Sequence, residues 1–208
     1  MSDEKLADVR KRRMHERDAT YRAIGRYVVE FSLVVAYMQI DVIERICFET
    51  DTAPLAYLTL GEAPAKQISD AFFAVCAAAG GCDTNELRIL RKIQTRLNEE
   101  ITRRNDFAHG DWFEALGPSD DDNPATFVLT RMKPSRKTNP GSTKPYSSRD
   151  LEAAVDEVRL LASWVLDVGD ALLRPHPADQ SLKDYFGLDE TGAVTRSVLP
   201  GARSHGFY

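Results

Sequence analysis

The chain has 208 residues, a formal net charge of −5 at pH 7 and a hydrophobic content of 43%. This length is enough for one globular domain with a buried core, and the composition is that of an ordinary soluble protein. The negative charge excludes a protein that binds nucleic acid over its whole surface, so a nucleic-acid site would need a local basic patch. No hydrophobic leader and no apolar run of membrane-spanning length occur, which predicts a cytoplasmic protein without a membrane contact.

The cysteines and histidines give no sign of a metal site or another cofactor. Cys47, Cys76 and Cys82 contain no Cys-x-x-Cys pair, so we expect reduced thiols that mostly fill the core. The four histidines are His15, His109, His176 and His205. None forms a His-x-x-x-His pair, and a metal-dependent hydrolase is therefore disfavoured.

Residues 1–19 form a charged leader whose basic cluster, residues 10–13, is best explained as a solvated helix face. From residue 21 to about 49, apolar residues recur in steps of four and three, which is typical of a long amphipathic helix. This stripe consists of Ile24, Val28, Phe31, Val35, Met38 and Val42, and Tyr27, Val34 and Ile46 widen it into a broader face. A helix of this length needs other helices to cover its apolar face.

The second helix should begin near Glu62 or Pro64 and end at Gly80 and Gly81. Asp83 and Glu86 have the spacing of a capping box, which predicts the start of a third helix. The apolar residues on the buried side of the third helix are Leu90, Ile93, Leu97 and Ile101.

After Gly110 the helical periodicity stops, and an insertion covers about residues 114–146. Residues 126–131 are β-branched and favour a strand, whereas residues 133–145 have the composition of a loop. Four cations of this insertion are candidate substrate-binding residues: Arg131, Lys133, Arg136 and Lys137. Ser147 or Ser148 should cap the last major helix, which ends at Pro175.

Four amphipathic helices predict an all-α protein, a four-helix bundle with a small β-like or loop insertion between the third and fourth helices. The bundle would occupy residues 20–175. Residues 176–208, which Gly and Pro interrupt, are expected to form an extended C-terminal tail that packs on the surface or on a neighbour.

The end of the third helix contains a cation, an amide and an imidazole within six residues: Arg104, Asn105 and His109, followed by Gly110. The same Arg-x4-His spacing occurs at Arg10 and His15, but there it lies in a charged run with no apolar residue to anchor it. Phe107 and Ala108 make the second occurrence the better candidate.

Arg104, Asn105 and His109, in a predicted four-helix bundle, resemble the signature of the HEPN superfamily: an Arg, a polar residue and, a few positions later, a His. The resemblance implies a metal-independent endoribonuclease, often a toxin or phage-defence effector, with RNA as substrate. It also implies a homodimer whose active site forms where two copies of the motif meet, and a cognate antitoxin as a candidate partner.

The chemistry of RNA cleavage fits these residue types. RNA carries its own nucleophile, the 2′-OH, so cleavage needs a proton acceptor, a proton donor and stabilisation of charge at phosphorus, but no metal. Imidazole exchanges protons near neutral pH, and guanidinium binds phosphate oxygens in a bidentate way. In one regular helix Arg104 and His109 lie about 140° apart, so a single helix cannot direct both at one phosphate. Two copies each of Arg103 and Arg104 would make a shared cleft locally positive.

Each motif residue also has a purely structural explanation. Arg104 could form a surface ion pair with Glu100, His109 could be a cation at the helix C-terminus, and Asn105 could be an ordinary surface residue. Trp112 is expected to be a core residue. A second function class therefore stays open: a catalytically silent HEPN-like bundle that acts as a nucleic-acid- or protein-binding dimerisation module.

Overall fold

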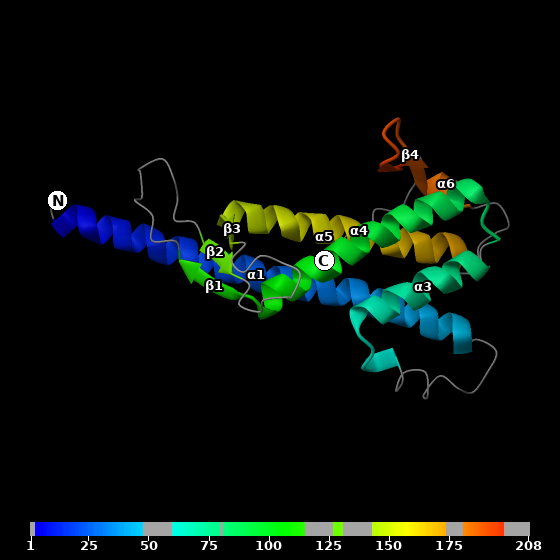
Figure 1. Ribbon diagram of the computed structural model, residues 1–208, viewed down its shortest axis with the longest axis horizontal. Coiled ribbons are helices and arrows are strands. Elements are labelled where there is room, and N and C mark those ends of the chain that lie inside the picture. The colour runs from blue at the N-terminus through cyan, green and yellow to red at the C-terminus, as the bar shows by residue number, and fades with distance from the viewer. Residues whose placement is uncertain are drawn as a thin grey trace. The chain divides into compact units, whose positions relative to one another are not determined.

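The computed structural model describes residues 3–47, 60–79, 81–114, 127–130, 143–173 and 181–197. The elements in chain order are α1 (Asp3–Cys47), α3 (Ala65–Ala79), α4 (Thr84–His109), β1 (Asp111–Glu114), β2 (Phe127–Thr130), β3 (Thr143–Tyr146), α5 (Ser148–Leu172), α6 (Leu182–Tyr185), β4 (Phe186–Leu188) and β5 (Val194–Arg196) (Figure 1). The predicted fold class is confirmed: the chain is mainly helical, with a small β insertion between its third and fourth long helices.

The chain divides into two compact units that cut across its long helices. Unit 1 consists of Met1–Phe31 and Thr102–Arg159, and unit 2 consists of Ser32–Ile101 and Leu160–Tyr208. Helices α1, α4 and α5 therefore each contribute one end to each unit. Helix α1 is continuous from Asp3, so the charged residues 3–19 belong to the same helix as the apolar stripe.

The buried face of α1 overlaps the expected one but is centred on its widened side. Tyr27, Phe31, Val34, Met38 and Val42 are almost completely buried, whereas Ile24, Val28 and Val35 are only partly buried. Both sets of positions have helical spacing and belong to one broad apolar face. Turning this face toward Tyr27 and Phe31 buries two aromatic side chains, which adds apolar area to the core.

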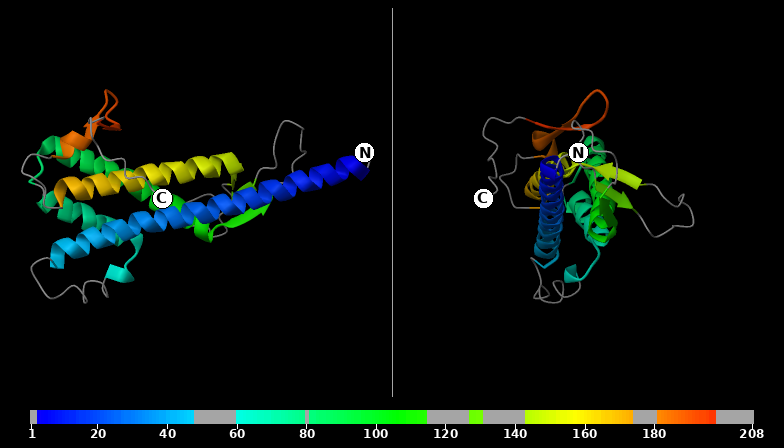
Figure 2. Two further views of the ribbon diagram at one scale, coloured as in Figure 1. Left: turned by 180° about the vertical axis from the view of Figure 1, so that it is seen from behind. Right: turned by 90° about the vertical axis from the view of Figure 1, so that its left-hand side faces the viewer.

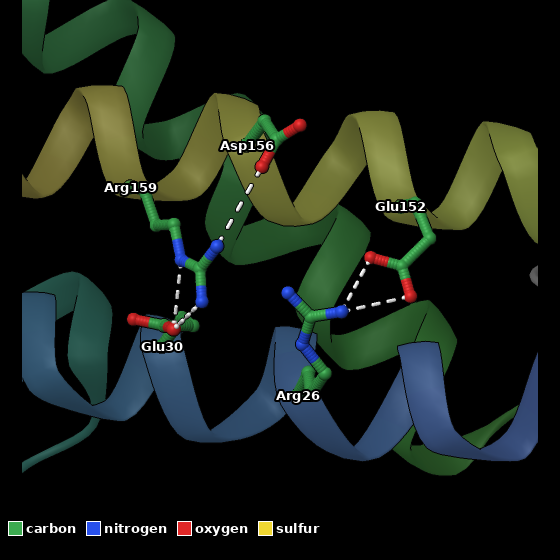
Figure 3. A network of polar contacts seen from close by, with 5 residues as sticks. All are labelled: Arg26, Glu30, Glu152, Asp156 and Arg159. Carbon is green, nitrogen blue, oxygen red and sulfur yellow. Dashed lines mark hydrogen bonds and ion pairs between the residues drawn. The ribbon is translucent and has the colours of Figure 1, made fainter.

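In unit 1, α1 and α5 run side by side in the same direction (Figures 1 and 2). Figure 3 shows the polar contacts between them: Arg26 donates to both carboxylate oxygens of Glu152 at 2.9 and 2.7 Å, and Arg159 pairs with Glu30 at 2.7 Å. The side chains of Arg26 and Glu152 are 40% and 42% exposed, so such a pair contributes only about 0–1 kcal/mol to stability. These pairs align the two helices more than they stabilise them.

The predicted insertion contains an antiparallel sheet with the order β1–β2–β3. Strand β2 confirms the strand expected there, but β3 occupies a stretch expected to be loop. The stretch has the composition of a loop, and its Pro145 has no N–H to donate to a sheet. An edge strand tolerates that loss, and β3 is at the edge. Arg131, Lys133, Arg136 and Lys137 lie outside the described residues.

Side-chain hydrogen bonds cap the N-termini of α4 and α5, where the sequence predicts that helices begin. The Asp83 N–H donates to Glu86 Oε2 at 2.9 Å, and the Glu86 N–H donates to Asp83 Oδ1 at 3.0 Å. At α5, Ser147 and Asp150 exchange the same pair of bonds, at 2.8 and 3.2 Å. Both are capping boxes, which satisfy amide groups that a helix start leaves without partners.

The C-terminal segment differs from the expected extended tail. Residues 181–197 fold in unit 2 as α6 and a β4–β5 hairpin, and Leu182 and Phe186 are buried. Asp189 accepts bonds from the amides of Thr191 and Ala193 and thereby shapes the hairpin turn, in which Gly192 has a φ of 77°. In the sequence this fold is indicated only by two apolar residues four positions apart and one turn. That pattern is too short to distinguish a folded segment from an irregular tail.

Cys76 and Cys82 have free thiols, and burial raises the pKa of Cys76, so this thiol is an unreactive core group. Within the described ranges, no helix is long and apolar enough to cross a membrane.

Two glycines provide a matched test of helix packing in α1 and α5. An alanine at Gly169 would place its Cβ 3.1 Å from Asp41 Cγ and closer still to Asp41 Oδ2, and Asp41 is 3% exposed. We expect Gly169→Ala to destabilise the chain, because overpacking costs about 1–3 kcal/mol and outweighs the helix propensity of alanine. Gly25, with no atom within 4 Å, is the control: Gly25→Ala should stabilise by about 0.5–1 kcal/mol. Urea unfolding measures both, and an equal gain in the two variants would contradict the tight approach at Gly169.

Candidate functional site

The last two turns of α4 contain the predicted motif in an unbroken helix. The Gly110 N–H donates to the Asp106 carbonyl at 2.8 Å, so the helical hydrogen bonding continues past His109. Strand β1 begins directly afterwards at Asp111. Arg104 and His109 therefore keep the separation of about 140° that a regular helix imposes. The end of the helix comes after the histidine and does not bring the two side chains together.

Phe107 anchors this end of α4 in unit 1. It is 2% exposed, and its ring centroid lies 4.8 Å from that of Tyr27, 5.2 Å from that of Tyr146 and 5.5 Å from that of Trp112. Trp112 is half-buried, and its Nε1 donates to the Phe107 carbonyl at 3.1 Å. Trp112 is therefore not the fully buried core residue that was expected, but it is one of four rings that fix how α4 is turned about its axis.

With Phe107 pointing inward, the helix geometry places Asn105 and His109 on the opposite side. Each is about 160° from Phe107 around the helix, and both side chains are exposed. Arg104 is about 60° from Phe107 and is half-buried. Asn105 and His109 thus face solvent, on the side of α4 opposite to the buried Phe107, and Arg104 lies between the two sides.

Arg104 bonds to an amide and not to an acid. Its Nη1 donates to Asn105 Oδ1 at 3.2 Å, whereas Glu100, the expected alternative partner, accepts an ion pair from Arg96 at 3.4 Å. Within the part of the chain that the structure describes, no carboxylate pairs with Arg104. A neutral neighbour leaves its full positive charge available to an anion.

The side-chain oxygen of Asn105 accepts a hydrogen bond from Arg104, and among the described residues no hydrogen bond joins Asn105 to His109, so Asn105 does not orient the imidazole. His109 is the last residue of α4, where a protonated imidazole gains about 0.3–1 kcal/mol from the helix dipole. Exposure makes the ring accessible to a substrate, and its terminal position is equally consistent with a helix-capping cation.

Arg103 has a different environment from Arg104. It pairs with Glu157 of α5 at 2.6 Å and lines a pocket of about 340 Å³ together with Tyr146. The structure therefore brings Arg104 and Asn105 together, leaves His109 on the Asn105 side, and directs Arg103 to α5. Sequence reasoning missed Tyr146 and Glu157, because no local pattern predicts a contact between residues 54 positions apart.

Two further features give weaker candidates. Arg10 and His15, the other Arg-x4-His pair, are exposed on α1. In unit 2 a hollow of about 610 Å³ lies beside Arg88, Lys183 and the C-terminal hairpin. There a hydrogen bond with Asp83 raises the pKa of Lys183 and lowers that of Asp83, so this lysine is already engaged in an ion pair. Among the residues described, no group of three or more His, Cys, Asp or Glu side chains could hold a metal ion.

Comparison with protein-family models, with curated proteins and with solved structures found no match for this chain.

Proposed function

We propose that this protein is a metal-independent endoribonuclease of the HEPN type, cytoplasmic, and a toxin or phage-defence effector held in check by a cognate antitoxin. The observation that carries the proposal is that Phe107 holds α4 so that Asn105 and His109 face solvent, with the half-buried Arg104 bonded to Asn105 beside them. An accessible imidazole and an arginine with no acidic partner among the described residues are groups that RNA cleavage uses.

The reaction proceeds by transfer of the RNA phosphoryl group to its own 2′-oxygen. One imidazole accepts the 2′-OH proton as the 2′-oxygen forms a bond to phosphorus, and the bond between phosphorus and the 5′-oxygen breaks. A second imidazole, protonated, gives its proton to the departing 5′-oxygen. Arg104 stabilises the negative charge on the phosphorane oxygens. The products are a 2′,3′-cyclic phosphate and a 5′-hydroxyl end.

The second imidazole comes from a second copy of the chain. One α4 offers one His109, and Arg104 lies about 140° away from it. A two-fold homodimer supplies an acid and a base to a shared cleft, and two copies of Arg104 give that cleft positive potential. Arg103 contributes less than its charge suggests, because Glu157 neutralises it. Arg131, Lys133, Arg136 and Lys137 are proposed to hold the RNA outside the cleft.

The second candidate is a catalytically silent bundle that binds nucleic acid or protein through the same face of α4. The exposed and unoriented ring of His109 at the end of a helix favours it. The two candidates differ in whether a bond in RNA is cut, and cleavage assays separate them.

His109→Ala should abolish cleavage of single-stranded RNA, whereas the unchanged protein should cut it in the presence of EDTA and leave 2′,3′-cyclic phosphate ends. Because His109 is exposed, the variant should keep its helical circular dichroism and its melting temperature. His15→Ala, the exposed histidine of the other Arg-x4-His pair, is the control and should retain activity. A requirement for a divalent metal would refute the mechanism.

Arg104→Lys should lower the cleavage rate at least about tenfold, equivalent to about 1.4 kcal/mol in the barrier, because lysine keeps the charge but loses the planar fork. Arg96→Lys is a matched control on the same helix, where the arginine pairs with Glu99 and Glu100. Single-turnover kinetics measures both. Equal rates for Arg104→Lys and the unchanged protein would exclude a bidentate phosphate clamp.

Mixtures of His109→Ala chains with unchanged chains test the shared site. If both histidines are needed, mixed dimers are inactive and activity falls as the square of the unchanged fraction. Activity and sedimentation should be measured on the same mixtures after exchange. A linear fall, or a monomer at micromolar concentration, would show that each chain works alone.

A further inference from the structure

A pocket of about 340 Å³ lies in unit 1 beside the motif, between the end of α4, strand β3 and the first turns of α5. The small side chains of Ala153 and Ala154 leave the space, and Tyr146 forms one wall. Pockets that bind small molecules have volumes of about 300–1,000 Å³, so this one suits a single small group. It lies next to the predicted site but contains none of Arg104, Asn105 and His109.

The ring of Tyr146 is accessible and rigidly held. Tyr146 is half-buried, and its ring packs edge-on against Phe107 with a centroid distance of 5.2 Å and lies 5.8 Å from that of Trp112. Aromatic rings held in this way are the platforms on which single-stranded nucleic acids stack their bases. The Tyr146 wall therefore offers a surface on which a planar ring can stack.

The charges of the pocket disfavour an anion and favour a group with N–H donors. Two carboxylates, Asp150 and Glu157, face the space together with one guanidinium, that of Arg103. This net negative charge repels phosphate, so the pocket does not simply extend the anion site at Arg104. Carboxylate oxygens accept hydrogen bonds from ring and exocyclic N–H groups.

The pairing of Arg103 with Glu157 at 2.6 Å places a donor fork directly beside an acceptor pair. Guanine presents the complementary order along one edge: the O6 acceptor, then the N1–H and N2–H donors. Arginine binds guanine O6 and N7, and a carboxylate accepts from base N–H groups. Uracil has one ring N–H between two carbonyl groups. In the same position, a uracil carbonyl oxygen would lie against a carboxylate oxygen, and two acceptors cannot form a hydrogen bond.

The position on α4 connects the pocket to the cleavage site. Arg103 and Arg104 are adjacent residues that point about 100° apart, one to the pocket and one toward the Asn105 side. A phosphate held by Arg104 would therefore have a base within reach of the pocket. We propose that this pocket is a guanine-binding subsite for a nucleotide next to the cleaved bond, an inference that rests on the ribonuclease function proposed above.

Direct binding tests the subsite without relying on cleavage. In a Trp164→Phe background, Trp112 is the only tryptophan, and its contact with Tyr146 makes its fluorescence a reporter of the pocket. Guanosine, adenosine, cytidine and uridine 5′-monophosphates are titrated separately into the full chain. Guanosine monophosphate should bind at least about fivefold more tightly than uridine monophosphate, as expected for one good bidentate contact to a base.

Glu157→Gln replaces one of the two acceptor oxygens with an NH2 donor, which cannot accept from the guanine N–H groups, and should reduce this preference to near one. Glu152→Gln is the matched control: it makes the same change on the same helix and also breaks an arginine pair, with Arg26, but does not line the pocket. The control should keep the full preference. Equal affinity for the four monophosphates, a preference that survives Glu157→Gln, or an equal loss in both variants would each overturn the proposal.

Mapping the ends of cleaved RNA separates the two proposals. Cuts next to guanosine that become random in Glu157→Gln support both. Guanosine monophosphate preference in a chain that cuts no RNA supports the subsite and refutes the ribonuclease. Cleavage without any guanosine preference refutes the subsite alone.

Discussion

The packing of the Phe107 ring against Tyr27, Trp112 and Tyr146 is the constraint on which the candidate site depends. An α-helix is rigid about its axis, so fixing one side chain fixes the direction of all its neighbours. Once Phe107 points inward, Arg103 must face α5, and Asn105 and His109 must face solvent. The motif owes its accessibility to an apolar residue in its middle that takes no part in the proposed chemistry.

Charge is distributed around this anchor in a way that overall composition hides. The chain has a net charge of −5, yet Arg26, Arg103 and Arg159 are each matched by a carboxylate across a helix pair, whereas Arg104 is bonded to an amide. Even an exposed arginine that pairs with a carboxylate contributes only about 0–1 kcal/mol to folding stability. The bond of Arg104 to an amide therefore costs the fold little. The value of this arginine lies in a positive charge that a phosphate can use.

The sequence predicted the features that arise within one or two helical turns. The capping boxes at Asp83 and Ser147 and the buried stripe from Leu90 to Ile101 depend on neighbours three or four residues away, and these neighbours are visible in the chain. The pairing of Arg103 with Glu157 depends on contacts between distant segments, and so do strand β3 and the hairpin anchored by Phe186. No periodicity specifies such contacts, so the sequence placed the motif residues at the end of a helix but did not predict which residues they contact.

The direction of the motif also restricts how a second copy can dock. Tyr27 shows that α1 covers the Phe107 side of α4, and His109 lies about 160° from Phe107. Tyr21 and Val29 are exposed and are turned about 120° and 160° from Tyr27 around α1, so they face away from α4. An interface built on those apolar residues would hold the two histidines apart. A shared cleft therefore requires that α4 meet α4 of the partner, with polar side chains and the end of a helix at its centre.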